Sequence, residues 1–295
     1  DAGFEFEWGA GPVSAYRTAT EFGVDSLAIG LSITENEHPG GLQQLIDGKF
    51  DDQIRQLAHF LSMVKGPVYL RIGYEFDGAW NEGYENPEKY KAAFIRIVDV
   101  LREEQADNFV TVWQAGAAVV DEVIDGRHED ITLWYPGDDY VDWMGFSWFM
   151  NPHETIQVSS TYDPGTPLEL TEELLAVARA RNKPVMIAEA SPQAMDLNEN
   201  FMANHTGIWD GEPATGHVRM TDDEIWNHWF EPLFDLLEQN RDVIHALAYI
   251  NADWDSQEMW GPPYTSGFWG DTRLEVNDVL AAKFSAAVEV WKAPR

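Results

Sequence analysis

Two glutamates occupy corresponding places in this chain, each at the end of a short apolar stretch. Glu75 follows the stretch 68–72, and Glu189 shares one face of a second stretch with Val185 and Ile187, because successive side chains of a strand point to opposite faces. A retaining glycosidase needs two such carboxyl groups about 5–5.5 Å apart: one protonates the leaving oxygen and the other attacks the anomeric carbon. Two close carboxylates also move each other's pKa values apart, which separates an acid from a nucleophile.

The same alternation groups a cation with the first carboxylate. Arg71, Gly73 and Glu75 fall on one face of an expected strand, so that face carries two charges and a gap that a packing face would lack. We expect Arg71 to orient Glu189 or to balance its charge. The alternative is a purely structural ion pair between Arg71 and a buried Glu75.

The elements that must position these residues alternate between strand-like and helix-like patterns. The expected strands are residues 26–33, 68–75, 109–114, 140–149, 183–189 and 244–250. The expected helices are residues 12–22, 51–64, 171–181, 221–239 and 277–291, with one more beginning at Pro87. This order predicts a parallel sheet, and a carboxylate at the carboxyl end of a strand is typical of the catalytic face of a (β/α)8 barrel.

The strand count falls short of a complete barrel, which has eight strands. Residues 4–8 offer one strand beyond those above. We therefore expect an α/β fold, a (β/α)8 TIM barrel lacking or trimmed in its first one or two strands, as a single domain over residues 1–295. An open doubly wound sheet is the alternative, although no glycine-rich phosphate loop follows any strand. Residues 190–221 read as one long loop, closed by a capping box at Thr221 and Glu224.

Composition excludes several partners and chemistries. The 51 acidic and 19 basic side chains give a formal net charge of −32, which repels nucleic acid and anionic membranes. The absence of cysteine excludes disulfides and thiolate metal sites. No metalloprotease, calcium-loop or serine-hydrolase motif is present, so we expect neither a catalytic metal nor a cofactor. The opening Asp1-Ala2-Gly3 suggests a processed start, and we expect a secreted, extracellular or periplasmic monomer.

The segment around the first glutamate resembles glycoside hydrolase family 26, the β-mannanase family of the clan of retaining (β/α)8 barrels. That family's strand-four motif reads Arg, x, x, His, Glu, Met, Asn, Gly, x, Trp, and this chain matches it at Arg71, Glu75, Gly78 and Trp80. The resemblance implies that Glu75 is the acid/base.

Two further segments extend this resemblance over most of the chain. Residues 135–145 are similar to the approach to strand six, and residues 183–189 are similar to strand seven with its nucleophile, which implies that role for Glu189. Counted this way, the strand at 26–33 is the third of the barrel. That numbering agrees with the shortfall of strands.

The chain departs from the family pattern around the expected cleavage point. Tyr74 replaces the usual His, and Asp77 replaces Asn. The segment Ser147-Trp148-Phe149 stands where the family commonly has a Tyr that hydrogen-bonds the nucleophile. Because of these departures, the resemblance does not identify the sugar on which the protein acts. β-Mannan, β-1,3-xylan and a neutral algal galactan are equally compatible substrates.

Aromatic and amide side chains in the expected loops are candidates for contact with a sugar. They are Arg71, Trp80, Asn81, Gln114, Trp148, His153, Asn251 and Trp254. Flat apolar rings beside hydrogen-bonding groups suit sugar faces; packing inside loops is the alternative, and a lone His is more often a surface or packing residue. We expect Trp254 to stack under the cleaved sugar.

These patterns predict a retaining, endo-acting glycoside hydrolase with a polysaccharide or oligosaccharide substrate. A barrel that binds carbohydrate without turnover is one alternative. A polysaccharide lyase is another, for which Tyr74 would have to be the base.

Overall fold

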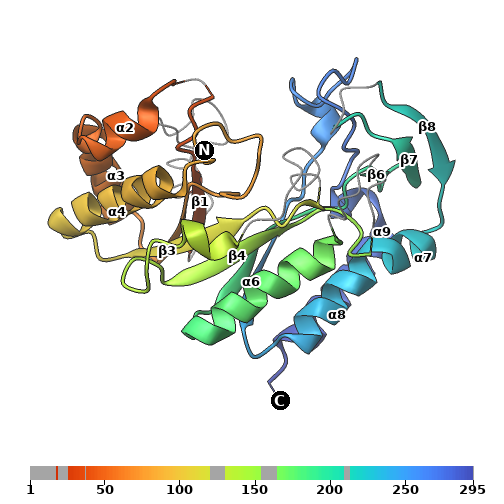
Figure 1. Cartoon of the computed structure of the whole chain (residues 1–295). Helices are drawn as coiled ribbons and strands as arrows, with labels where there is room; N and C mark the ends of the chain where they lie inside the picture. The colour runs from red at the N-terminus through yellow and green to blue at the C-terminus, as the bar shows by residue number, and fades with distance from the viewer. Residues whose placement is uncertain are drawn as a thin grey trace.

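Six strands form one parallel sheet in the computed structural model, which describes residues 18, 26–36, 38–119, 130–153, 165–208 and 213–294. They are β1 (Leu27–Leu31), β2 (Val68–Ile72), β3 (Phe109–Ala115), β4 (Trp143–Trp148), β5 (Val185–Ala190) and β9 (Ile244–Tyr249). Their order in the sheet follows their order along the chain, and every neighbouring pair is parallel. The curled sheet in Figure 1 confirms the predicted barrel architecture. The expected strand at 4–8 and most of the helix at 12–22 lie outside the described residues.

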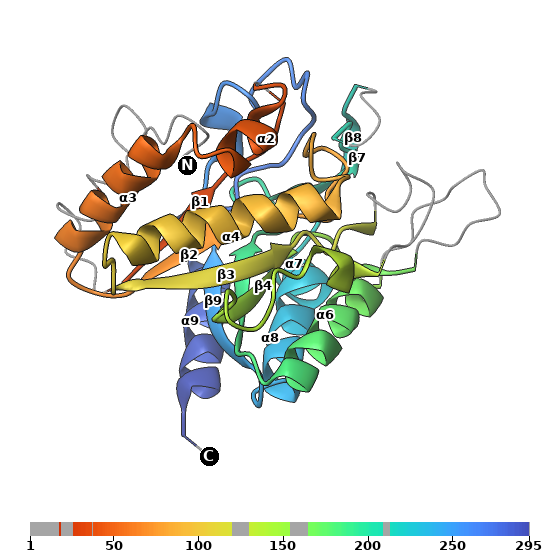
Figure 2. The ribbon, with the colours of Figure 1, turned by 60° about the vertical axis from the view of Figure 1, so that its left-hand side comes forward.

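Helices cover the outer side of the curled sheet. Their bounds are α2 (Gly41–Ile46), α3 (Asp51–Met63), α4 (Pro87–Glu103), α6 (Pro167–Arg181), α7 (Asp222–Ile225), α8 (Glu231–Gln239) and α9 (Asp278–Lys292), with a π-helical turn at Trp226–Phe230 between α7 and α8. Both views show α3 beside α4 and α6 beside α8 (Figures 1 and 2). The helix α2 lies in a stretch for which no element was expected.

Local capping decides where the helices begin. Helix α4 starts at Pro87 as predicted, because the Asn86 side chain accepts a hydrogen bond from Lys89 N. Helix α6 starts four residues before the prediction. Its capping box is formed by Thr166 and Glu169, which leaves Thr171, the first residue of the expected helix, buried inside the helix.

The prediction of a long loop after β5 is wrong. This stretch contains a three-stranded antiparallel sheet of β6 (Met195–Asp196), β7 (Phe201–His205) and β8 (Thr215–Arg219). The sheet lies at the end of the molecule opposite the C-terminus, beside the loops that follow β9 (Figures 1 and 2). Its strands are short, β7 is mostly half-buried and β8 is exposed, so they lack the apolar alternation that reveals a strand in a sequence.

Two apolar clusters lie on the two faces of the main sheet. The large one fills the space between the sheet and the helices. The small one consists of Val112, Met186 and Ala188, packed against Tyr69, Trp143 and Ala246 on the inner face. The inner cluster forms an apolar floor beneath the carboxyl ends of the strands, where the polar residues described below gather.

Candidate active site

Glu75 lies three residues beyond the end of β2, so the prediction that it continues the strand is wrong. The chain turns at Gly73, whose φ is +55°; a Cβ there would stand 2.6 Å from Cε2 of Tyr90. Gly73 therefore faces the outer core and does not share a face with Arg71. Glu75 itself has φ +54°, a conformation that non-glycine residues adopt at a cost and that is common at functional sites.

Three side chains hold Glu75 in this conformation. The Asn81 amide donates to the main-chain oxygen of Glu75 at 2.8 Å. Trp80 Nε1 donates to Oε2 at 3.2 Å, and Ser147 Oγ donates to Oε1 at 2.7 Å. Both carboxyl oxygens thus have a donor, one from the following loop and one from β4.

The environment of Glu75 favours its protonated form. Burial, followed by the negative charges of Glu189 and Asp77, raises the pKa of Glu75 from 4.5 to about 8. The hydrogen bonds from Ser147 and Trp80 oppose that rise, because they stabilise the ionised carboxyl group. At neutral pH Glu75 therefore carries a proton that it can donate.

Glu189 reaches the inner face of the sheet through an irregularity in β5. Val185 and Ile187 belong to the outer core, whereas Met186 and Ala188 face the inner cluster, so simple alternation would send Glu189 outward. The register shifts on both sides of this strand, opposite Phe146/Ser147 on β4 and between Ile187 and Ala190 against β9. The prediction that Glu189 shares a face with Val185 and Ile187 is therefore wrong. β-Bulges commonly re-aim side chains next to active sites.

Arg71 on β2 forms hydrogen bonds to both Glu189 on β5 and Gln114 on β3. Its Nη1 donates to Oε1 of Glu189 and, at 2.9 Å, to Oε1 of Gln114. Its guanidinium carbon lies 5.1 Å from the centre of the Tyr74 ring, and Gly30 leaves room for both groups, because a Cβ there would stand 3.0 Å from the ring. The ion pair joins Arg71 to Glu189 and not to Glu75.

The loop after Glu75 is fastened to the carboxyl end of β3. Both carboxyl oxygens of Asp77 accept main-chain hydrogen bonds, from Gly116 N and Ala117 N. Gly78 allows the Trp80 ring to fold back, since a Cβ there would stand 2.5 Å from it. Asp77, which departs from the family motif, therefore holds the segment that carries Glu75.

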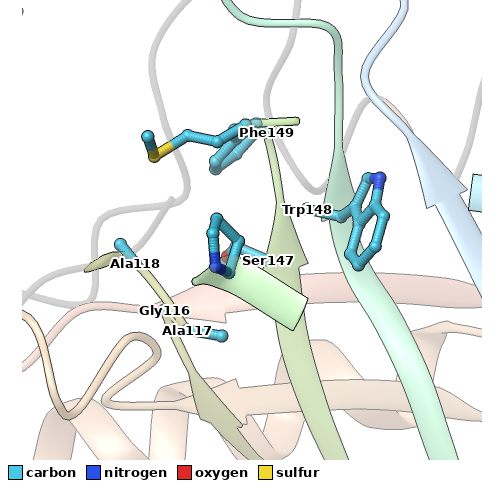
Figure 3. Close-up of a pocket in the computed structure, with 8 residues that line it drawn as sticks. Gly116, Ala117, Ala118, Ser147, Trp148 and Phe149 are labelled. Atoms are coloured by element: carbon cyan, nitrogen blue, oxygen red, sulfur yellow. The ribbon is translucent and has the colours of Figure 1, made fainter. Parts of the chain in front are cut away.

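Trp148 and its neighbours line a small cavity of about 20 Å³ between β3 and β4. Figure 3 shows Ala117 and Ala118 facing Ser147 and Phe149 there, whereas the Trp148 indole lies toward the neighbouring strand. Trp148 is only 2% exposed. The cavity has room for about one water molecule and not for a sugar ring.

Trp254 belongs to a cluster of indoles after β9. Its ring stacks on Trp269 with 4.7 Å between centroids and meets Trp260 edge-on, and its Nε1 donates to Thr272 Oγ1 at 3.1 Å. Two other residues that were predicted to contact the sugar, Asn251 and His153, have different surroundings. Asn251 contacts Glu275 and Leu274 N, and His153 is exposed.

No group of three or more potential metal ligands occurs within the described ranges. None of the helices described is both long and apolar enough to cross a membrane. The site combines two carboxyl groups with different surroundings: one favours its protonated form, and the other is paired with a guanidinium. This arrangement is suited to acid/base chemistry.

The model of glycosyl hydrolase family 26 matches residues 21–262. The chain belongs to glycosyl hydrolase family 26. Among its family relatives, the β-1,3-xylanase TXYA of a Vibrio species is 34% identical over 277 residues, covering 94% of this chain and 54% of the relative. A β-1,3-xylanase of an Alcaligenes species is 33% identical over 282 residues, covering 95% and 54%. This family 26 chain thus spans about half the length of these two relatives.

Solved structures of the family share the fold. A β-mannanase of Bacteroides ovatus superposes with a TM-score of 0.53 at 16% identity, covering 88% of this chain and 67% of that one. An endo-β-1,4-mannanase double mutant of Cellulomonas fimi gives 0.56 at 14% identity, covering 90% and 54%. At such identities the likeness establishes the barrel fold of this family 26 protein and not its substrate.

Sequence reasoning passed over two parts of the site. Ser147 drew notice only as a departure from the family motif, yet its hydroxyl contacts Glu75. Asp77 was likewise only a departure, yet it fastens the loop. The position of Ser147 two strands away from Glu75 in the sheet, at the end of β4, is the signal that could have drawn attention to it.

Proposed function

We propose that this family 26 protein is a retaining glycoside hydrolase that cleaves a β-linked polysaccharide, with Glu75 as acid/base and Glu189 as nucleophile. The observation that carries the proposal is the contrast between the two carboxyl groups. Burial and neighbouring charge raise the pKa of Glu75 to about 8, whereas Glu189 is paired with the cation of Arg71. A protonated acid beside an ionised nucleophile is the arrangement that double displacement requires.

The reaction proceeds in two displacements. Glu189 attacks the anomeric carbon while Glu75 gives its proton to the glycosidic oxygen, so the glycosidic bond breaks as a glycosyl ester forms on Glu189. Glu75 is then ionised and removes a proton from water, whose oxygen attacks the same carbon and frees Glu189. Esterification removes the charge of Glu189, which in the free enzyme raises the pKa of Glu75. Loss of that charge allows Glu75 to remain ionised as the base.

β-1,3-Xylan is the substrate we propose first. Two curated relatives at 34% and 33% identity carry the name β-1,3-xylanase, and the solved mannanases are far more distant in sequence. We further propose endo-action, outside the cell, by one barrel domain. The residues that we propose for sugar contact are Arg71, Trp80, Asn81, His153, Asn251 and Trp254. Trp148 and Gln114 were also expected to contact the sugar, but they are 2% and 0% exposed, so burial excludes them from that role.

A panel of β-1,3-xylan, β-1,4-mannan and neutral galactan, with products analysed by mass and by NMR, tests this proposal. We expect β-1,3-xylo-oligosaccharides of several lengths, released first as the β-anomer. Initial release of the α-anomer would contradict retention. Saturable binding without new reducing ends would indicate a binding barrel, and an unsaturated product absorbing in the ultraviolet would indicate a lyase.

Two variants test the assignment of the glutamates. Glu189→Ala removes the nucleophile, so turnover should fall by about 10⁴-fold or more. Glu75→Ala removes the acid, so hydrolysis of the polysaccharide should collapse while an aryl glycoside with a good leaving group still forms the glycosyl-enzyme. Added azide should then yield a β-glycosyl azide. Near-wild-type turnover by either variant excludes the corresponding role.

A further inference from the structure

Two neutral side chains connect the proposed acid/base to the proposed nucleophile. Gln114 on β3 and Ser147 on β4 are 0% and 4% exposed. Arg71 Nη1 donates to Gln114 Oε1 at 2.9 Å, Gln114 Nε2 donates to Ser147 Oγ at 3.1 Å, and Ser147 Oγ donates to Glu75 Oε1 at 2.7 Å. The same Nη1 also donates to Glu189, so hydrogen bonds run without a break from one glutamate to the other.

When Glu75 is ionised, chemistry fixes the direction of every bond in this path. A guanidinium can only donate, so Gln114 must present its amide oxygen to Arg71 and its NH2 group to Ser147. The hydroxyl of Ser147 then accepts from Gln114, and its single proton points to Glu75. The path therefore delivers a donor to the ionised form of Glu75, and in that state it has no equivalent arrangement with the bonds reversed.

We propose that Gln114 and Ser147 are positioning residues through which the one guanidinium of Arg71 acts on both carboxyl groups: directly on Glu189, and through two polarised hydrogen bonds on Glu75. The inference rests on the proposed function, because it assigns a purpose to the path within double displacement. Ser147 stabilises Glu75 when it has given up its proton, and this is the state in which Glu75 must activate water.

The surroundings of the path strengthen its effect. It lies above the inner apolar cluster of Val112, Met186 and Ala188, where a low local dielectric makes each hydrogen bond electrostatically stronger and lets successive bonds polarise one another. β3 lies between β2 and β4, and the strand register places Gln114 opposite Gly145. The Gln114 side chain thus reaches Ser147 at a place where the residue opposite it on β4, Gly145, has no side chain.

The alkaline limb of the pH profile for kcat/KM measures this effect, because activity is lost there as Glu75 loses its proton. Glu189 from β5, Asp77 from the following loop and the phenols of Tyr74 and Tyr84 also face Glu75, and all of them remain in place in the variants used. Ser147→Ala removes a donor to the ionised form, so the limb should move up by about 0.5–1 pH unit.

Ser191→Ala is a matched control. Ser191 is also fully buried, follows β5 closely, and its hydroxyl has no hydrogen-bond partner among the described residues. Its removal should leave the alkaline limb where it is. An unmoved limb in Ser147→Ala, or an equal movement in both variants, would overturn the proposal.

Gln114→Met tests the relay at a position that does not touch Glu75. Without the amide, Ser147 loses the partner that orients its proton, so the alkaline limb should again move up, by less than in Ser147→Ala. The double variant should show the movement of Ser147→Ala alone, because the two residues act through one path. Additive movements, or no movement in Gln114→Met, would contradict the relay.

Titration of the Glu75 carboxyl by NMR, with carboxyl-labelled glutamate and Glu75→Gln for assignment, separates the two proposals. Its pKa should rise in Ser147→Ala whether or not a substrate has been found. A rise without hydrolysis of any polysaccharide would refute the proposed function and support the path. Hydrolysis with an unchanged titration of Glu75 would refute the path and leave the proposed function in place.

Discussion

Arg71 and Glu189 form an ion pair although 118 positions separate them in the chain. The two side chains are 14% and 20% exposed, so the pair is largely withdrawn from water. Replacement of one partner of such a pair is costly, because the charge of the other partner is left without compensation. The contact thus links β2 to β5 across the inside of the curled sheet.

Replacement of this arginine tests the pairing. Arg71→Met should lower kcat/KM by about 10²-fold, since Glu189 loses the donor that orients it and Glu75 loses the path that stabilises the charge it gains. Arg71→Lys should recover only part of the loss, because a flexible ammonium group does not reproduce the fixed position of Nη1, which donates to both Glu189 and Gln114. Arg55→Met, at an exposed ion pair with Asp52, serves as the control and should retain full activity. Full activity in Arg71→Met would exclude the proposed role.

Replacement of Asp77 also tests the raised pKa of Glu75, and the expected shift of that pKa is opposite to the one in Ser147→Ala. Its negative charge is one cause of the raised pKa of Glu75. In Asp77→Asn the pKa of Glu75 should fall, so the alkaline limb of kcat/KM should move to lower pH. The loop should also lose one of its two main-chain contacts, lowering stability by about 1 kcal/mol. The exposed Asp107→Asn is the control, and an upward movement of the limb in Asp77→Asn would contradict the assignment.

The raised pKa of Glu75 should also reduce stability at neutral and alkaline pH. The unfolded chain releases this proton near the ordinary value of 4.5, whereas the folded protein retains it to about 8. Between these values the unfolded state binds fewer protons, so the free energy of unfolding decreases as pH rises. Glu75→Gln should therefore stabilise the protein by about 1–3 kcal/mol at pH 8 and hardly at all at pH 4.

Glu172→Gln is the appropriate comparison for that measurement. It makes the same change of a carboxyl group to an amide, on the exposed face of α6. The midpoints of thermal unfolding of the two variants should differ only as pH rises across this range. Equal midpoints at every pH would show that the surroundings of Glu75 do not destabilise its ionised form.

The indole cluster after β9 tests the contact with substrate. Trp254→Ala removes the ring that stacks on Trp269, so KM should rise about tenfold, equivalent to 1.4 kcal/mol, with a smaller change in kcat. Trp226→Phe, in the aromatic stack with Phe230 and Phe234, should change neither constant. A change in kcat alone in Trp254→Ala would indicate that this ring does not bind the sugar in the ground state.

The sequence was sufficient for the order of the six main strands, and it drew attention to the two glutamates that we propose as catalytic. Alternation in Val68, Leu70 and Ile72 predicts β2, and the apolar spacing of α3 predicts that helix, because each pattern reflects which face is buried. The six strands found in sequence are the six in the sheet. The β6–β8 sheet escaped prediction because pairing between exposed and half-buried strands leaves little apolar periodicity.

Sequence patterns alone determined that the two glutamates lie at or just beyond the carboxyl ends of buried strands, and tertiary structure alone decided where their side chains point. Strict alternation fails at both: Gly73 turns the chain before Glu75, and the shifted register of β5 brings Glu189 inward. The physical reason is that backbone irregularities are set by neighbouring strands and packed rings, which a local pattern does not contain. The partners of these carboxyl groups, Arg71 and Ser147, meet them only because the sheet curls.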